Sequence, residues 1–556
     1  MNKTAARDVI LPLIVIFLLF SFACSNSGKE DTRTVFKYNE SKGISSLDPA
    51  YARNQTIIWP VHQLFNGLLE MDEQLNIQPC IAKSWEILDS GRLYEFRLRD
   101  DVFFHDHEFF PDGKGRKANA HDAAYSLQRL RDPKIASPGA WIMNNVTEGD
   151  SGIYAVNDSV LHIRLKKPFP AFTGILTMQY CSVLPADLVE YIGEDFRNNP
   201  VGTGPFMFKK WIEGEKLVLL KNPEYFQKDN SGERLPYLDA IAISFITDKQ
   251  SEFMEFMKGN LDFLSGVHAV YKDELITRGG NLNPRYEGKI KMITLPYLNT
   301  EYLGILQDST LPVMNDNPLL NKNVRKAINH GFDRAKMMAY LRNNLGSPAN
   351  SGIIPKGLPV YQEKAGYGYS YSPDLSRKLL HEAGYDASAK VPLIKLTTTS
   401  DYLDLCEFIQ HDLANVGIDI ELEVATGATF RDMVANGKLA FFRASWIADY
   451  PDAENYLALF YSQNRSPGGP NYTRFRNARY DSLYRLSQVA GSDKIRTSCY
   501  QAMDSIITSE AVIIPLYYDV VVRFTWSNIL NMKANPMNLL DLKQVRKSER
   551  TNSFKY

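Results

Sequence analysis

Two residues of opposite charge lie in a stretch whose other residues are mostly apolar or small. The stretch FFRASWIADY, residues 441–450, carries Arg443 and Asp449. Because an extended chain alternates its faces, both charges share one face with Ser445 and Ile447, and the other face carries Phe442, Ala444, Trp446 and Ala448. At about 3.3 Å per residue the two charges stand roughly 20 Å apart along the strand, too far to neutralise each other. Each therefore needs another partner.

An extended peptide is one partner that would satisfy both charges. Its α-ammonium would face Asp449 and its α-carboxylate would face Arg443, with room for a few residues of about 3.3 Å each between them. The strand itself would supply N–H and C=O groups to the peptide backbone. The alternative is an internal ion-pair partner for each charge, which most buried charges have. Taken alone, these residues favour the internal partners.

No signature of enzyme chemistry accompanies this strand. The stretch GTGPF at 202–206 lacks the Lys-Ser/Thr of a phosphate-binding loop, and neither a G-x-S-x-G nor an H-E-x-x-H motif occurs. His105, Asp106 and His107 lie close together, but such spacing in a turn is more typical of a solvated loop than of a metal site. We therefore predict no catalytic residue, no metal site, no cofactor and no enzymatic activity.

Composition limits the class of protein and its partners. The chain has 556 residues, 44% hydrophobic and 23% charged, which is a globular composition large enough for two or three domains. Its formal net charge is −1 and its pI about 6.8, so the overall field attracts neither nucleic acid nor anionic lipid.

The first residues are typical of a secretory signal. Lys3 and Arg7 precede an uncharged apolar run that ends at Ala23, and Cys24 follows. We predict a signal peptide over 1–23 and a flexible polar tether over 24–33, with an uncleaved N-terminal anchor as the alternative. Four further cysteines are far apart and are expected to be single buried thiols, although three disulfide pairings remain open; they are Cys80, Cys181, Cys406 and Cys499.

Residues 392–461 alternate strands and helices. PLIKLTTT reads as a strand, a helix with apolar residues from Leu405 to Val416 follows, and IDIELEV reads as a second strand. A short helix around Phe430 then leads to the 441–450 strand. This order predicts a mainly parallel sheet covered by helices, whose ligands bind beyond the carboxyl ends of the strands, where Asp449 falls.

The remaining chain predicts covering helices and a smaller mixed region. Helical spacing indicates helices over 321–342 and 372–384. RLYEFRLRDDVFF and SVLHIRLKKPF alternate as strands and indicate a small region at about 72–199.

Several segments, in order, resemble the peptide-, dipeptide- and nickel-binding solute receptors of ABC importers. They are the SSLDP to LRDDVFFHD region, GTGPFMFKKWIEGEKLVLLKNPEYF, NKNVRKAINHGFDRAKMM, SPDLSRKLLHEAGY and FRASWIADY. The resemblance extends over nearly all of residues 34–540. It implies an α/β, periplasmic-binding-protein-like two-lobe fold with an additional small α+β domain.

The same resemblance implies domain boundaries. Lobe I would comprise 34–71, 200–288 and 512–545, with the small domain of 72–199 inserted in it. Lobe II would be 289–511, and 546–556 would be a polar tail.

The resemblance also implies the roles of single residues. Asp449 would take a peptide's α-ammonium and Arg443 its carboxylate, with Ser445 and Ile447 offering backbone groups and Trp446 matching a motif tryptophan. An opposing strand would place Asn54, Gln55 and Thr56 across the peptide. A histidine that some oligopeptide receptors use for the carboxylate falls near Leu403, where this chain has none.

The function implied is that of a monomeric extracytoplasmic receptor, lipidated at Cys24, that delivers peptides to an ABC permease. Its only contact with the membrane would be that lipid. The alternatives are a receptor of the same family for a nickel chelate, haem or an oligosaccharide, a surface lipoprotein that senses or scavenges peptides without transport and, from another class, a secreted hydrolase.

Overall fold

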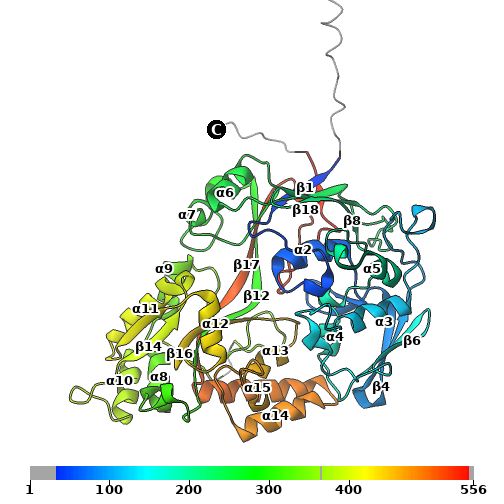
Figure 1. The fold of residues 1–556 in the computed structure, drawn as a ribbon. Helices are drawn as coiled ribbons and strands as arrows, with labels where there is room; N and C mark the ends of the chain where they lie inside the picture. The colour runs from blue at the N-terminus through cyan, green and yellow to red at the C-terminus, as the bar shows by residue number, and fades with distance from the viewer. Residues whose placement is uncertain (1–32, 364–365, 550–556) are drawn as a thin grey trace, which may run out of the picture.

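The computed structural model describes residues 33–363 and 366–549. In this part of the chain, three sheets of four or more strands are surrounded by helices (Figure 1). The signal segment, Cys24 and nearly all of the predicted tether lie outside the described residues. No helix among those described is long and apolar enough to cross a membrane.

A four-stranded sheet lies near the start of the described chain. Its order is β1(Val35–Asn39), β10(Ala240–Ser244), β9(Lys216–Lys221), β8(Phe206–Ile212). Helix α2(Gln55–Leu64) packs against β8 and buries Trp59 and Val61, which belong to the same hydrophobic core as Phe36 of β1. Two short strands, β2(Leu69–Met71) and β3(Ile77–Pro79), follow α2.

A second four-stranded sheet occupies the region predicted to be a small mixed domain. Its order is β4(Ala82–Leu88), β5(Leu93–Leu98), β7(Val160–Arg164), β6(Ile153–Asn157), so both predicted strands are present. The helices around it are α3(Ala120–Arg129), α4(Phe172–Ile175) and α5(Ala186–Ile192). Phe96 and Leu161 of this sheet belong to one core cluster with Phe36 and Leu217 of the first sheet. The two sheets therefore form one body with a shared core.

The third sheet has seven strands and contains the 441–447 strand. Its order is β11(Phe263–Ser265), β17(Ile513–Trp526), β12(Ile290–Ile305), β16(Phe441–Ile447), β14(Ile394–Thr398), β15(Ile420–Val424), with β13(Ser347–Pro348) beside β17. Strand β14 is parallel to both β15 and β16, as the alternation of strands and helices predicts. The other pairings are antiparallel, so the prediction of a mainly parallel sheet is wrong for the sheet as a whole, because β11, β12, β13 and β17 come from outside the alternating segment. The intervening helices α11(Leu403–Ala414) and α12(Gly427–Ala435) also lie where the sequence predicts them.

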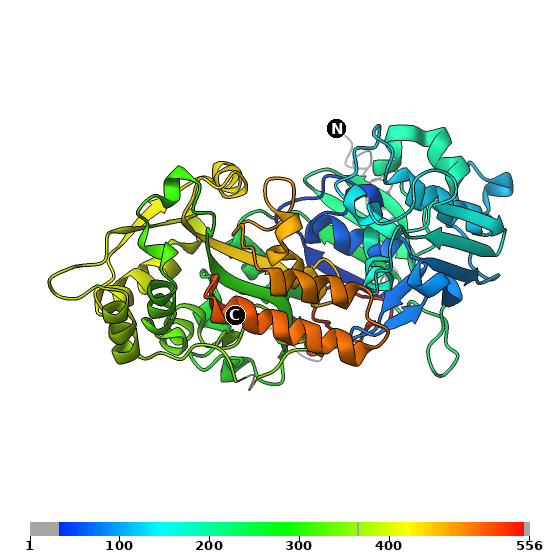
Figure 2. The ribbon, with the colours of Figure 1, turned by 90° about the horizontal axis from the view of Figure 1, so that it is seen from below.

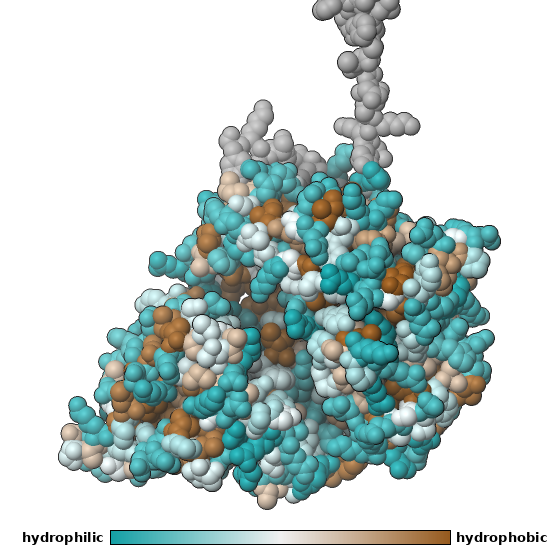
Figure 3. Space-filling view, in the orientation of Figure 1, coloured by the Kyte–Doolittle hydropathy of each residue, from teal (hydrophilic) through white to brown (hydrophobic). Residues whose placement is uncertain are grey.

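The third sheet and the helices around it form a second body. The two longest strands of this sheet, β12 and β17, connect the second body to the first. One end of β17 pairs with β11, which contacts β1, whereas β12 pairs with β16 over Asn299–Ile305. Between these ends, β12 and β17 change register between Pro296 and Thr300. A recess opens between the two bodies on the face shown in Figure 3.

Further helices complete the second body. The pair α14(Ala478–Gln488) and α15(Asp493–Ser509) lie side by side (Figure 2). The others are α8(Lys322–His330), α9(Arg334–Arg342), α10(Pro373–Glu382) and α13(Glu454–Leu457). Four elements lie outside the second body, namely α6(Lys249–Met257), α7(Lys272–Leu275), β18(Ile529–Leu530) and β19(Arg546–Lys547).

The single helix predicted over 321–342 is wrong, because the structure has two. Helix α8 ends at Gly331, and Asp333 caps a new helix by accepting hydrogen bonds from the N–H groups of Ala335 and Lys336. By contrast, the helix predicted over 372–384 is confirmed as α10, with Ser372 as its N-cap.

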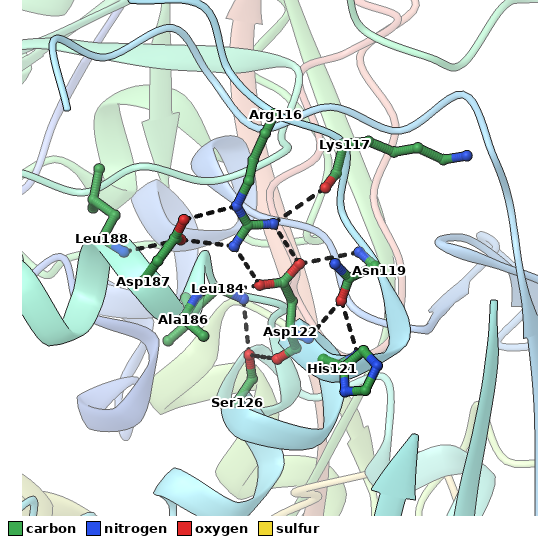
Figure 4. A network of polar contacts seen from close by, with 10 residues as sticks. All are labelled: Arg116, Lys117, Asn119, His121, Asp122, Ser126, Leu184, Ala186, Asp187 and Leu188. Carbon is green, nitrogen blue, oxygen red and sulfur yellow. Dashed lines mark hydrogen bonds and ion pairs between the residues drawn. The ribbon is translucent and has the colours of Figure 1, made fainter. Parts of the chain in front are cut away.

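An ion-pair network joins the GKGRK loop to α3 and α5 (Figure 4). Arg116 donates two 2.7 Å hydrogen bonds to Asp122, whose side chain is 2% exposed, and two more to Asp187. Asp122 and Asn119 also form the capping box of α3. Because these charges satisfy one another, we assign the network to stability.

The four cysteines expected as single buried thiols are buried and free, which confirms that prediction. The His105–Asp106–His107 turn is not a cluster of exposed ligands. The ring of His105 is buried, with Nε2 2.9 Å from the carbonyl of Gly204 and Nδ1 accepting from the N–H of Gly202. Asp106 pairs instead with Lys114, and no group of three metal-ligating side chains occurs among the described residues.

Candidate functional site

Strand β16 has one open edge. It pairs antiparallel with β12 from Phe441 to Ile447, whereas β14 pairs with it at Phe442 alone. In an antiparallel pair, only alternate residues direct their N–H and C=O groups at the partner strand. The N–H of Ala448 donates to Leu298 and the carbonyl of Ala440 accepts from Leu306, so the even-numbered residues of β16 are the ones bonded to β12.

The odd-numbered residues of β16 consequently direct their backbone groups away from β12. These are Arg443, Ser445 and Ile447, and beyond Phe442 no described strand lies along that edge. The edge can therefore accept an added strand, and the side chain of Ile447, 49% exposed, lies beside it.

Asp449 lies two residues beyond this edge. Its side chain is exposed and forms no ion pair with any described residue. Its hydrogen-bond partner is Asn455, whose Nδ2 donates to Asp449 Oδ2 at 3.3 Å. Desolvation by the surrounding protein raises the pKa of the Asp449 carboxyl, and the Asn455 bond partly offsets this. An uncompensated carboxylate that the surrounding protein desolvates favours a cationic ligand group.

Asn455 fixes the direction of the Asp449 segment. Its Oδ1 accepts both from Trp446 Nε1 at 2.7 Å and from the Asp449 N–H at 3.1 Å. Trp446 packs against the hydrophobic cluster of α14 and α15, as its position on the opposite strand face predicts. One amide thus ties the end of β16 to the start of α13.

The segment after Asp449 reaches the first body. Tyr450 belongs to the core cluster of that body, and Pro451 adjoins Gly174 of α4, where a Cβ would lie in ordinary van der Waals contact, 3.5 Å from Pro451 Cδ. Burial raises the pKa of Tyr180 to about 12, and the negative charge of Asp449 adds to this, while Arg53 acts oppositely. Asp449 is therefore near enough to Tyr180 of the first body for its charge to raise the pKa of that hydroxyl.

Arg443 has an internal partner. Its Nη2 forms an ion pair with Glu301 of β12, and its Cζ lies 3.2 Å from the ring centroid of Tyr402. The side chains of Arg443 and Glu301 are 11% and 4% exposed. Of the two charges that the sequence singles out, one is compensated inside the protein and the other is not.

The Arg443 pair continues into a second, partly exposed pair. Asn299 Nδ2 lies 3.2 Å from both Glu301 Oε1 and Asp519 Oδ2, and Asp519 accepts from Arg342 Nη2 at 2.6 Å. The cluster of Arg443, Glu301, Asp519 and Arg342 is formally neutral.

The strand expected to carry Asn54, Gln55 and Thr56 is wrong, because these residues start helix α2. Asn54 is its N-cap and accepts from the Ile57 N–H, while Thr56 donates to Asn54 at 2.7 Å. Gln55 accepts from Asn538 at 3.4 Å. Asn54 is exposed, but its side-chain oxygen serves the helix.

Sequence reasoning missed four residues of this site, namely Glu301, Tyr402, Asn455 and Tyr180. Asn455 lies in the same YPDAEN segment as Asp449, so a polar residue capping the strand end could have been expected. The other three come from distant parts of the chain and carry no local signal.

Comparison with known proteins agrees with this two-body architecture. The sequence profile of the bacterial extracellular solute-binding proteins, family 5, matches residues 76–468. The chain belongs to this family of solute-binding proteins.

Its relatives include binders of several ligand classes. It is 28% identical over 513 residues to the probable deoxycholate-binding periplasmic protein YgiS of Escherichia coli K12, covering 88% of this chain and 89% of that protein. It is 26% identical to the periplasmic oligopeptide-binding protein OppA of Salmonella typhimurium, covering 89% and 88%.

Two solved structures show the same fold. HbpA2 of Haemophilus parasuis matches with a TM-score of 0.79 and 21% identity, covering 93% of this chain and 100% of that chain. The unliganded open form of the periplasmic murein tripeptide-binding protein MppA matches with a TM-score of 0.76 and 23% identity, covering 94% of this chain and 98% of that chain.

Proposed function

We propose that this protein is an extracytoplasmic receptor that binds peptides as an added strand along β16 and delivers them to an ABC importer. The observation that carries this proposal is the open edge of β16, where the backbone groups of Ser445 and Ile447 face away from β12 and Asp449 follows. Backbone hydrogen bonds of this kind give affinity with little dependence on peptide sequence.

Asp449 is the group that takes the α-ammonium. An ammonium there completes a charge pair that no described residue supplies, and desolvation of the carboxyl by the surrounding protein strengthens a charge-assisted bond. Trp446 acts through Asn455 to hold Asp449, rather than by touching the ligand. The residues that approach the peptide from the opposite side lie at the start of α2 on the first body, namely Asn54, Gln55 and Thr56.

Closure of the two bodies follows from the same contacts. A ligand that touches β16 and the first body together favours the closed arrangement by its differential contacts. Strands β12 and β17, which connect the bodies and change register between Pro296 and Thr300, are where this movement is accommodated. The protein binds its ligand without transforming it, and Cys24 carries the lipid that retains it at the membrane.

The ligand classes of the relatives define a second candidate, an acidic amphipathic molecule such as a bile acid. The similarity of this chain to a probable deoxycholate-binding protein favours this second candidate. The uncompensated carboxylate of Asp449 disfavours it, because an anion there would be repelled.

Native mass spectrometry and calorimetry separate the two. The peptide proposal expects co-purified peptides, binding of trialanine, and at least an about tenfold loss on N-acetylation, equivalent to about 1.4 kcal/mol. Binding of deoxycholate, with no response to any peptide, would replace it. Anchoring is tested separately by labelling with a fatty-acid analogue, which Cys24→Ser should abolish and Cys499→Ser should leave intact.

A further inference from the structure

The far end of the proposed peptide site contains a carboxylate, Glu301, for which no sequence pattern predicts a place beside Arg443. Arg443 is the cation on the β16 face that would meet the ligand's carboxylate, and Glu301 lies diagonally opposite it on β12. Their ion pair is almost completely buried, and Tyr402 covers the guanidinium from another side.

These contacts fix both the charge and the orientation of Arg443. Glu301 cannot turn away without leaving a buried anion unpaired, and it is also held by Asn299, which itself contacts Asp519. Arg342 compensates Asp519, so the neighbouring pair supplies no spare positive charge either. A ligand carboxylate approaching this end meets an arginine and a glutamate of nearly equal and opposite effect.

We infer that Glu301 makes the receptor indifferent to the ligand's α-carboxylate, so that it selects peptides by their amino end alone. This deepens, and rests on, the peptide-binding function proposed above. The ligands accepted would include free peptides, peptide amides and peptides whose carboxyl end extends beyond Arg443. Glu301 is thus a specificity-determining residue that acts by neutralising Arg443.

Three trialanine probes test this inference in the full mature protein at pH 7, where the peptide's ammonium and carboxylate are both charged. Burial raises the pKa of Glu301, and the positive charge of Arg443 opposes this and favours the charged pair. We expect the dissociation constants of the free acid and the C-terminal amide to agree within about threefold, and the N-acetylated peptide to bind at least about tenfold more weakly. A free acid bound at least about tenfold more tightly than its amide would overturn the inference.

The variant Glu301→Gln tests the assigned cause. It removes the compensating charge and keeps an amide beside Arg443, so the free acid should become preferred over the amide by about tenfold. The matched control is Glu421→Gln, which removes an exposed carboxylate from the same sheet, where it pairs with Lys395, and should leave the ratio unchanged. A folded Glu301→Gln protein with the wild-type ratio would contradict the role of Glu301.

The outcomes separate this inference from the proposed function. Loss of all peptide binding, or indifference to N-acetylation, would refute the function itself. Sensitivity to both ends would refute only the role of Glu301. If Glu301→Gln does not fold, the ratio of acid to amide in the wild-type protein still decides.

Discussion

Replacing Asp449 with asparagine removes the charge proposed to bind the ligand's ammonium and leaves the shape nearly unchanged. Asn455 Nδ2 can still donate to the side-chain oxygen at position 449, and the backbone bond from Asp449 to Asn455 Oδ1 is unaffected. A hydrogen bond to a charged group contributes about 1.5–3 kcal/mol, so peptide affinity should fall about 10- to 150-fold.

Thermal stability should rise slightly or stay unchanged on this replacement. Desolvation raises the pKa of Asp449 in the folded protein, so the folded state binds a proton more readily than the unfolded state. The charged form is therefore slightly destabilising at neutral pH, and the neutral asparagine relieves this.

Calorimetric titration with trialanine and a thermal melt measure both quantities. Asp419→Asn is a matched control, because it removes an exposed carboxylate of the same body at the start of β15, away from the open edge of β16. We expect the control to bind like the wild type. A folded Asp449→Asn protein with unchanged affinity would refute the role assigned to Asp449.

Three further predictions concern stability and reactivity. Burial raises the pKa of Glu454 to about 7, so the free energy of unfolding should fall by roughly 3 kcal/mol from this group as pH rises from about 4.5 to 7. Glu454→Gln should remove that contribution from the pH dependence of unfolding, and an unchanged pH dependence would contradict the assignment. Asp122→Ala should lower the free energy of unfolding by about 1.5–3 kcal/mol, because it removes the buried acceptor of two charge-assisted hydrogen bonds from Arg116, which keeps Asp187 as its partner. Removing the exposed partner of Arg99 with Asp101→Ala should cost at most about 1 kcal/mol, and equal losses in denaturant titration would count against the assignment. The four described cysteines should not react with a thiol reagent at pH 8 until the protein unfolds, because all four are buried and burial raises the pKa of Cys406, for example, to about 11. Rapid labelling of any of these cysteines in the folded protein would contradict this prediction.

Local periodicity predicts the part of the fold that carries the site. The alternation in IDIELEV and the helical spacing from Leu405 to Val416 place β15 and α11 correctly, and the end of β16 before Asp449 follows from the same pattern. The break between α8 and α9 was missed because the apolar spacing continues across it, although Gly331 and Asp333 are the residues that end and restart a helix.

The partner of Arg443 could not be predicted in the same way. Whether Arg443 meets a ligand or Glu301 depends on the register between β12 and β16, which joins residues 142 positions apart. Asn54 shows the opposite case, because an asparagine directly before an apolar helical segment is an N-cap signal that was present in the sequence.

A crystal structure of the protein with trialanine tests the central claim most directly. We predict a peptide running along the open edge of β16, hydrogen-bonded to the backbone of Ser445 and Ile447, with its ammonium within hydrogen-bond distance of Asp449. A ligand bound away from this edge, or one whose ammonium contacts a different carboxylate, would contradict the account.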